Sequence, residues 1–218
     1  MNEENFYKMF WNIYIQLENE LIDTFKYIEF SVDNYKTYSS KFVKIFLQIG
    51  SEIDVCFKEY LNFSNPNGSD SINKYRNDLK IKDIDFFDEI VEINKLKITI
   101  KPLEDLKNNN SNVLWWTAYN KVKHERVNQV KIGNIKQEAY KFANLENVMT
   151  ALSGLYVLLM NIFAKIKNNR EDSPVPNSRL FKMKSKRWDD CKYFQKMYMA
   201  KVGEKFYLDN AFENLINQ

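Results

Sequence analysis

An uninterrupted stretch without charge, residues 147–164, most constrains what this chain can fold into. A helix of that length either crosses a lipid bilayer, which takes about 20 apolar residues, or fills the centre of a globular domain. The stretch also contains Asn147, Thr150, Ser153 and Asn161, whose polar groups are costly against lipid. We therefore expect the central helix of a soluble bundle, surrounded by its neighbours and not in a membrane. A membrane-attached helical protein is the alternative.

Two earlier segments have the apolar spacing of amphipathic helices. From Glu4 to Ile28, apolar side chains recur every three or four residues, which places them on one helical face. The same pattern runs from about Ser39 to Asn62, where a serine hydroxyl can cap the first turn. The chain has only five glycines and four prolines, which also favours long helices over a β-rich fold.

One short segment instead has the alternation of a β-strand. Leu96, Ile98 and Ile100 alternate with lysine and threonine, as in a strand with one face buried. A single strand is not stable alone, so this one needs a partner. Two partners are available along the chain: residues 90–93 in a hairpin, or residues 178–184 from the C-terminal part.

These patterns predict a mainly α fold, a four- to five-helix bundle with a minor β element. Residues 1–170 would form the bundle domain. Residues 171–218 would form a basic, aromatic C-terminal segment that is packed on the bundle or appended to it. A further helix is expected from Asn144, as N-cap, to Asn168.

Composition narrows the chemistry and the compartment. The net charge of +3 is mild, so any nucleic-acid binding must come from local patches. Two cysteines and one histidine cannot supply the four ligands of a common structural zinc site, and we expect neither a metal nor a cofactor. Cys56 is expected to be a small core residue. Free thiols and an N-terminus without a basic flank before an apolar run predict a cytoplasmic protein.

The candidate site is the stretch 115–126, which reads WWTAYNKVKHER. It contains the only histidine of the chain, His124, with the cations Lys121, Lys123 and Arg126 around it. A neutral imidazole beside fixed cations suits phosphodiester chemistry, because the imidazole moves a proton while the cations hold the phosphate. RNA supplies its own 2′-hydroxyl nucleophile, so such a cleavage needs no metal. A surface histidine without catalytic duty is the alternative.

We expect this stretch to be one helix that continues to about Val130 and stops at Gly133. On such a helix the tryptophans and Tyr119 face the core, while Asn120 and His124 lie one turn apart at the edge of that face.

The helical plan and the sequence YNKVKH resemble the HEPN superfamily, a group of small helical domains. These are often dimeric, are frequent in bacterial toxin–antitoxin and phage-defence systems, and include many metal-independent endoribonucleases. Their motif is an arginine, commonly a polar residue, three variable residues and a histidine. Asn120 matches the polar position and His124 the histidine, whereas the arginine position is occupied by Tyr119. The resemblance implies catalytic roles for His124 and Asn120, with Lys121, Lys123 or Arg126 as the substitute cation and Arg126 named as the catalytic one. It also implies a homodimer with a protein partner such as an antitoxin.

A second basic segment follows the bundle. From Arg179 to Lys201 there are eight Lys or Arg against two Asp, interleaved with aromatic residues. Such a mixture can bind single-stranded RNA, and its candidate phosphate-binding residues are Lys182, Lys184, Lys186 and Arg187. In the interpretation that we favour, the aromatic side chains pack on the bundle and the lysines form its solvated face.

The function that these features predict is an RNA-directed, HEPN-like protein, possessing metal-independent ribonuclease activity if His124 is active. Lys121 and Lys123 would bind the RNA beside the histidine. A non-catalytic helical module that engages a protein or RNA is the alternative.

Overall fold

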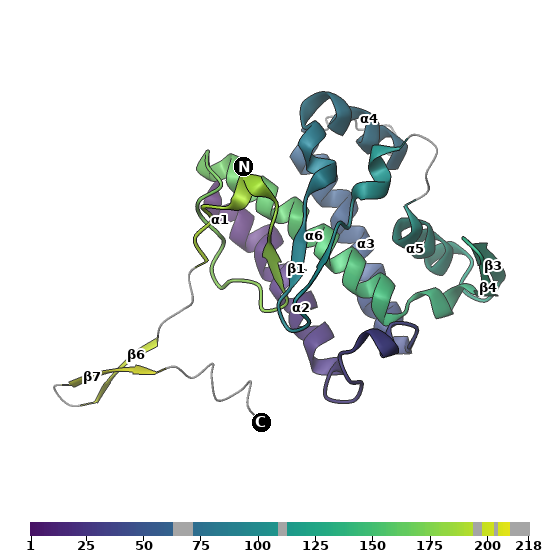
Figure 1. Ribbon diagram of the computed structural model, residues 1–218, viewed down its shortest axis with the longest axis horizontal. Helices are drawn as coiled ribbons and strands as arrows, with labels where there is room; N and C mark the ends of the chain where they lie inside the picture. The colour runs from purple at the N-terminus through teal and green to yellow at the C-terminus, as the bar shows by residue number, and fades with distance from the viewer. Residues whose placement is uncertain (63–71, 109–112, 194–197, 203–204, 210–218) are drawn as a thin grey trace.

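The computed structural model describes residues 1–62, 72–108, 113–193, 198–202 and 205–209 (Figure 1). The fold is mainly α, with small antiparallel β-sheets, as predicted. The α-helices are α1 (Glu3–Phe6), α2 (Asn12–Thr24), α3 (Ser40–Leu61), α4 (Ile72–Lys82), α5 (Leu114–His124) and α6 (Leu145–Lys167). The strands are β1 (Val91–Ile93), β2 (Ile98–Ile100), β3 (Gln129–Ile132), β4 (Ile135–Glu138), β5 (Phe181–Met183), β6 (Tyr198–Val202) and β7 (Lys205–Asp209).

The first predicted helix is confirmed as one continuous rod, although it ends at Thr24 and not at Ile28. A π-helical turn, Tyr7–Trp11, joins α1 to α2 within it. The indole of Trp11 is buried and donates a hydrogen bond to the carbonyl of Pro176 at 3.0 Å. The N-terminal helix therefore contacts the segment around Pro176, 165 residues later in the chain.

Both of the long helices begin and end at the polar residues that the sequence predicted. The hydroxyl of Ser39 accepts from the backbone N–H of Phe42, and the side chain of Asn144 accepts from that of Asn147. Each side chain satisfies a donor that the first turn leaves free. Asn62 and Asn168 then adopt left-handed backbone conformations that end α3 and α6.

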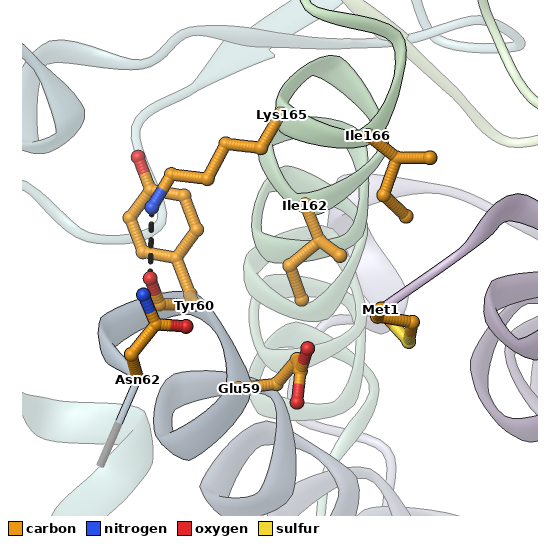
Figure 2. A pocket seen from close by; sticks show the side chains of 7 residues that line it. All are labelled: Met1, Glu59, Tyr60, Asn62, Ile162, Lys165 and Ile166. Carbon is orange, nitrogen blue, oxygen red and sulfur yellow. Dashed lines mark hydrogen bonds between the residues drawn. The ribbon is translucent and has the colours of Figure 1, made fainter.

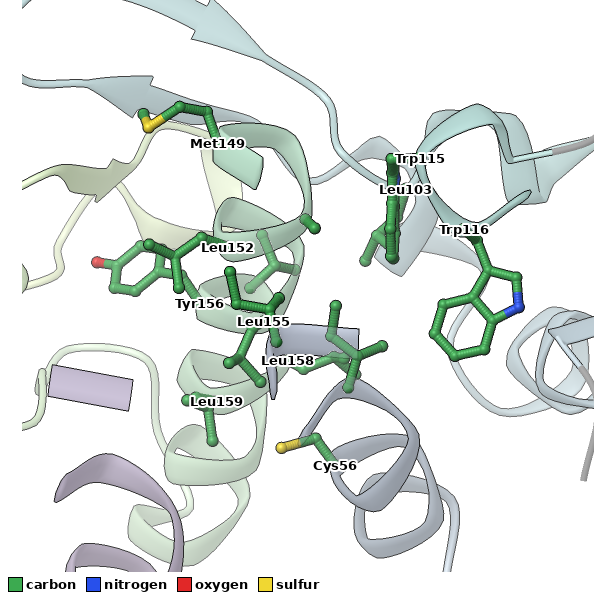
Figure 3. Close-up of a cluster of buried hydrophobic side chains, with 14 of the residues drawn as sticks. Cys56, Leu103, Trp115, Trp116, Met149, Leu152, Leu155, Tyr156, Leu158 and Leu159 are labelled. Atoms are coloured by element: carbon green, nitrogen blue, oxygen red, sulfur yellow. The ribbon is translucent and has the colours of Figure 1, made fainter. Parts of the chain in front are cut away.

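Helix α6 forms the centre of the protein and contacts α1, α2, α3 and α5. It is long and apolar enough to cross a membrane, but 89% of its most apolar stretch is buried inside the protein. Its side chains form one buried cluster with Trp115 of α5 and Cys56 of α3 (Figure 3). The prediction of a surrounded core helix is confirmed, and so is the assignment of Cys56 to the core.

The predicted strand is β2, and both of its proposed partners belong to the same sheet. The order is β2-β1-β5, all antiparallel. Strand β1 pairs Val91 with Ile100 of β2 on one side and with Met183 of β5 on the other. The predicted hairpin partner, β1, therefore pairs directly with β2. The predicted C-terminal partner, β5, pairs with the other edge of β1 and not with β2.

The prediction of a helix from Trp115 to Val130 is wrong after His124. Helix α5 ends there, and the chain turns into the β3–β4 hairpin, with Ile132 opposite Ile135. Burial alternates along β3, where Val130 and Ile132 are buried and their neighbours are exposed, which is the period of a strand. Gly133 has φ of +56° and forms the hairpin turn instead of a helix stop.

Residues 171–193 pack against the helices and are not a separate appendage. The predicted docking of the tail aromatics is confirmed for Phe181 and Trp188, whose side chains are buried. Phe194 and the side chain of Tyr198 lie outside the described residues. Strands β6 and β7 pair with each other in a hairpin.

Two buried carboxylates attach this segment to the helices. Glu89 accepts hydrogen bonds from the indole of Trp188, at 3.0 Å, and from the hydroxyl of Ser185. Glu18 of α2 accepts from the backbone N–H groups of Arg179 and Leu180, both at 3.1 Å. Burial raises the pKa of Glu18, although the hydrogen bonds to its carboxylate act in the opposite direction.

Candidate functional site at the end of helix α5

Aromatic side chains fix helix α5 in the core, as the sequence predicted. The indole of Trp115 donates to the carbonyl of Pro102 at 2.8 Å, and Trp116 and Tyr119 are buried. Tyr119 packs directly on Gly50 of α3, where an added methyl group would lie 2.3 Å from two of the ring carbons. Tyr119, which the sequence comparison sets against the arginine of the HEPN motif, is therefore a core residue.

His124 is the last residue of α5, and its side chain is exposed. Asn120 lies one turn earlier and is half-buried, and its amide donates to the carbonyl of Trp116 at 3.1 Å. Within the described part of the chain, the imidazole of His124 has neither a hydrogen bond nor an ion pair. It is thus accessible to a ligand from solvent.

The predicted cations lie within three positions of His124 along the chain, but they are not equivalent. Lys121 forms an ion pair with Glu125 at 2.5 Å. Lys123 is exposed, with its ammonium 5.7 Å from the ring centroid of Tyr119. Arg126 is exposed in the turn after the helix, where its carbonyl accepts from Tyr140 at 3.1 Å. Among the described residues, Lys123 and Arg126 have no carboxylate partner, so both can bind an anion.

The β3–β4 hairpin adds two cations that the sequence interpretation missed. Lys131 and Lys136 are direct cross-strand partners, and both are exposed. The hairpin lies at the periphery of the protein beside α5 (Figure 1). The alternation over residues 129–132 and the Gly133-Asn134 pair were the signals that could have revealed it.

The C-terminal cations do not join this site. Strand β5 pairs with β1, and Figure 1 shows it on the other side of α6 from α5. Lys184 lies 3.5 Å from Glu92, and the ammonium of Lys182 lies 4.9 Å from the ring centroid of Tyr193. Lys186 is exposed.

Arg187 is a structural residue, which corrects its assignment to RNA binding. Its guanidinium donates to both carboxylate oxygens of Asp83 at 2.9 and 3.1 Å, to Glu89 at 2.6 Å and to Asn161 at 2.6 Å. Burial alone would raise the pKa of Asp83, but these bonds and one from Tyr60 hold it below its usual value. The donors of Arg187 are therefore used inside the protein.

A concavity at the end of α3 also contains a lysine, but the structure gives that lysine a different role. The space is about 210 Å³ and is lined by Met1, Glu59, Tyr60, Asn62, Ile162, Lys165 and Ile166 (Figure 2). The ammonium of Lys165 donates to the carbonyl of Tyr60 at 2.8 Å and lies 3.5 Å from the centroid of its ring. Burial lowers the pKa of Lys165. Together with Lys82, which donates to the carbonyl of Leu61, it caps the C-terminus of α3.

Comparison with known proteins gives no family model, no curated protein and no solved structure that matches this chain. The function is therefore argued from the site alone.

Proposed function

We propose that this protein acts on RNA through the end of α5, as a HEPN-like, metal-independent endoribonuclease without a cofactor. The observation that carries the proposal is the exposed imidazole of His124, flanked along the chain by two exposed cations, Lys123 and Arg126, that have no carboxylate partner among the described residues. Free cations beside an accessible imidazole can hold a phosphate while a proton is moved.

In the proposed reaction, neutral His124 removes the proton from a ribose 2′-hydroxyl. The 2′-oxygen then forms a bond to the adjacent phosphorus, and the bond from phosphorus to the 5′-oxygen breaks. The products are a 2′,3′-cyclic phosphate and a 5′-hydroxyl, with the leaving oxygen taking up a proton. Lys123 and Arg126 offset the charge that develops on the phosphate, and the amide of Asn120 orients the substrate. Lys121 contributes less to phosphate binding because its ammonium forms an ion pair with Glu125.

The proposal includes the assembly and location of the protein. A homodimer would bring two His124 side chains to one cleft, and a protein partner such as an antitoxin would cover the exposed end of α5. The protein would work in the cytoplasm, in a defence or toxin–antitoxin type system. Lys182, Lys184 and Lys186 would form a second, weaker RNA-binding surface, separate from the first.

Binding of RNA without cleavage is the second candidate function. The observation that favours it is Tyr119, which packs in the core against Gly50 where the HEPN motif has an arginine. Without that arginine, the site has fewer groups to hold the scissile phosphate or to orient the histidine.

Cleavage of labelled RNA in EDTA tests the first candidate. We expect the wild-type protein to cleave and His124→Ala to lose activity by at least about 100-fold, the usual contribution of a general base. Lys95→Ala, an exposed substitution elsewhere, is the control and should leave cleavage unchanged. Equal cleavage by the wild-type and His124→Ala proteins would contradict the proposal. Binding by both proteins without cleavage would support the second candidate, and absence of binding would exclude both.

A further inference from the structure

The β3–β4 hairpin carries a charge arrangement that its own stability does not favour. Lys131 and Lys136 face each other directly in the antiparallel register. Like charges at such positions repel, because the two Cβ atoms are only about 5 Å apart. The carboxylate closest along the chain, Glu138, is already paired with Lys141 at 2.8 Å. Among the described residues, neither Lys131 nor Lys136 has an ion pair.

The hairpin is a fixed extension of α5. Val130 and Ile132 are buried on the face opposite the lysines, and β3 contacts α5. The carbonyl of Arg126 accepts from Tyr140, and that of Asn128 accepts from Ala139, so pairing continues from the strands down to the end of the helix. The lysine pair is thus held in a set position relative to His124.

Charge in this region is strongly one-sided. Residues 121–141 contain six lysines or arginines and two glutamates, a local excess of four positive charges, whereas the whole chain has a net charge of +3. Both glutamates are engaged in ion pairs within the region, with Lys121 and Lys141. The positive charge that is left free lies on Lys123, Arg126 and the two hairpin lysines.

We propose that the Lys131–Lys136 pair is a backbone-binding arm for the RNA whose other part lies at His124. This inference rests on the proposed function and adds a second contact to it. Lys131 lies five positions after Arg126 in the sequence, so the two backbones are at most about 16 Å apart. That reach corresponds to about five nucleotides at 3.4 Å each along one strand. The pair would therefore contact phosphates within about five nucleotides of the scissile bond, without reading bases.

The test compares Lys131→Gln/Lys136→Gln with the control Lys95→Gln/Lys97→Gln. The control removes two exposed lysines from the β1–β2 connection. The probe is a fluorescent single-stranded RNA of about 12 nucleotides, with 2′-O-methyl groups that block cleavage, longer than the reach of about five nucleotides. We expect about tenfold weaker binding by the hairpin variant and a salt slope smaller by about 1.4, since each lost phosphate contact removes about 0.7. The control should bind like the wild type.

Three further measurements keep the outcomes distinct. A dinucleotide substrate reaches only His124, so the hairpin variant should process it like the wild type. Lys123→Gln/Arg126→Gln should weaken binding of both lengths; if only this variant affects RNA, the arm is excluded and the proposed function stands. If only the hairpin variant weakens binding, the hairpin lysines bind RNA without a site at His124, which overturns the proposed function and the role of the pair as an arm of that site.

Wild-type protein that binds no RNA would overturn both proposals. Loss of binding to an acidic peptide or to anionic vesicles, with RNA binding unchanged, would overturn the arm and assign the pair to another partner. Lysines on exposed strands also hinder aggregation. If the hairpin variant aggregates but binds RNA normally, the lysine pair serves to prevent aggregation and the arm is excluded.

Discussion

At the scale of single residues, the contact between Tyr119 and Gly50 explains most about the candidate site. The ring occupies the space that any Cβ at position 50 would need. This contact brings α5 close to α3. It also places an aromatic ring where the HEPN motif has a guanidinium, so the proposed ribonuclease reaction would need its cations from Lys123 and Arg126 instead.

Replacing Gly50 with alanine should therefore destabilise the protein. The clash with Tyr119 should cost about 1–3 kcal/mol of unfolding free energy, more than the gain of about 1 kcal/mol in helix propensity. Urea unfolding measures the difference. Gly154→Ala is the matched control, because its nearest neighbour, an atom of Trp115, would lie 3.6 Å away. We expect that variant to be as stable as the wild type or more so. Equal stabilisation by both alanines would show that the ring gives way.

At the scale of elements, the long helices were predictable and the hairpin was not. Apolar stripes and capping residues such as Ser39 and Asn144 act locally, over one or two turns, so the sequence contains the whole signal. The four residues of β3 are too few for their alternation to dominate, and Val130 also fits the core face of a continued helix. The two lysines of the hairpin were missed for the same reason.

The turn of this hairpin should depend on Gly133. Its φ of +56° is unfavourable for residues with a Cβ, while the space around it is open, with no atom within 4 Å of an added Cβ. Gly133→Ala should cost about 1–2 kcal/mol through the backbone alone. Gly133→Asn should cost less, since asparagine tolerates this region better. Urea unfolding curves of the two variants test this, and an alanine variant as stable as wild type would contradict it.

At the scale of the whole molecule, residues 171–193 complete the core. Arg187 is bonded to Asp83 and Glu89, which lie 104 and 98 residues earlier. Contacts over such separations leave no periodic signal, so the sequence suggested a solvated RNA-binding arginine. Burial of Phe181 and Trp188 was foreseen because large aromatic side chains are seldom left exposed.

Removing the guanidinium of Arg187 should lower the free energy of unfolding. Arg187→Met leaves Glu89 buried without its cation, and breaking such a pair costs about 3 kcal/mol or more. Lys186→Met, at the exposed neighbouring position, should change stability by less than about 0.5 kcal/mol. Thermal and urea unfolding compare the two. Similar stabilities for both variants would mean that Arg187 contributes little to the fold.

The two buried carboxylates also carry a consequence for how the protein is made. Glu18 and Glu89 are synthesised before most of the groups that donate hydrogen bonds to them, which lie between Ser178 and Trp188. Until those groups are synthesised, α6 lacks its contact with β5, and the carboxylates of Glu18 and Glu89 must remain hydrated. The nascent chain thus passes through a stage in which its most apolar helix is exposed and its interior cannot close. A chain truncated before Ser178 would keep α6 partly exposed and both carboxylates without these hydrogen-bond donors.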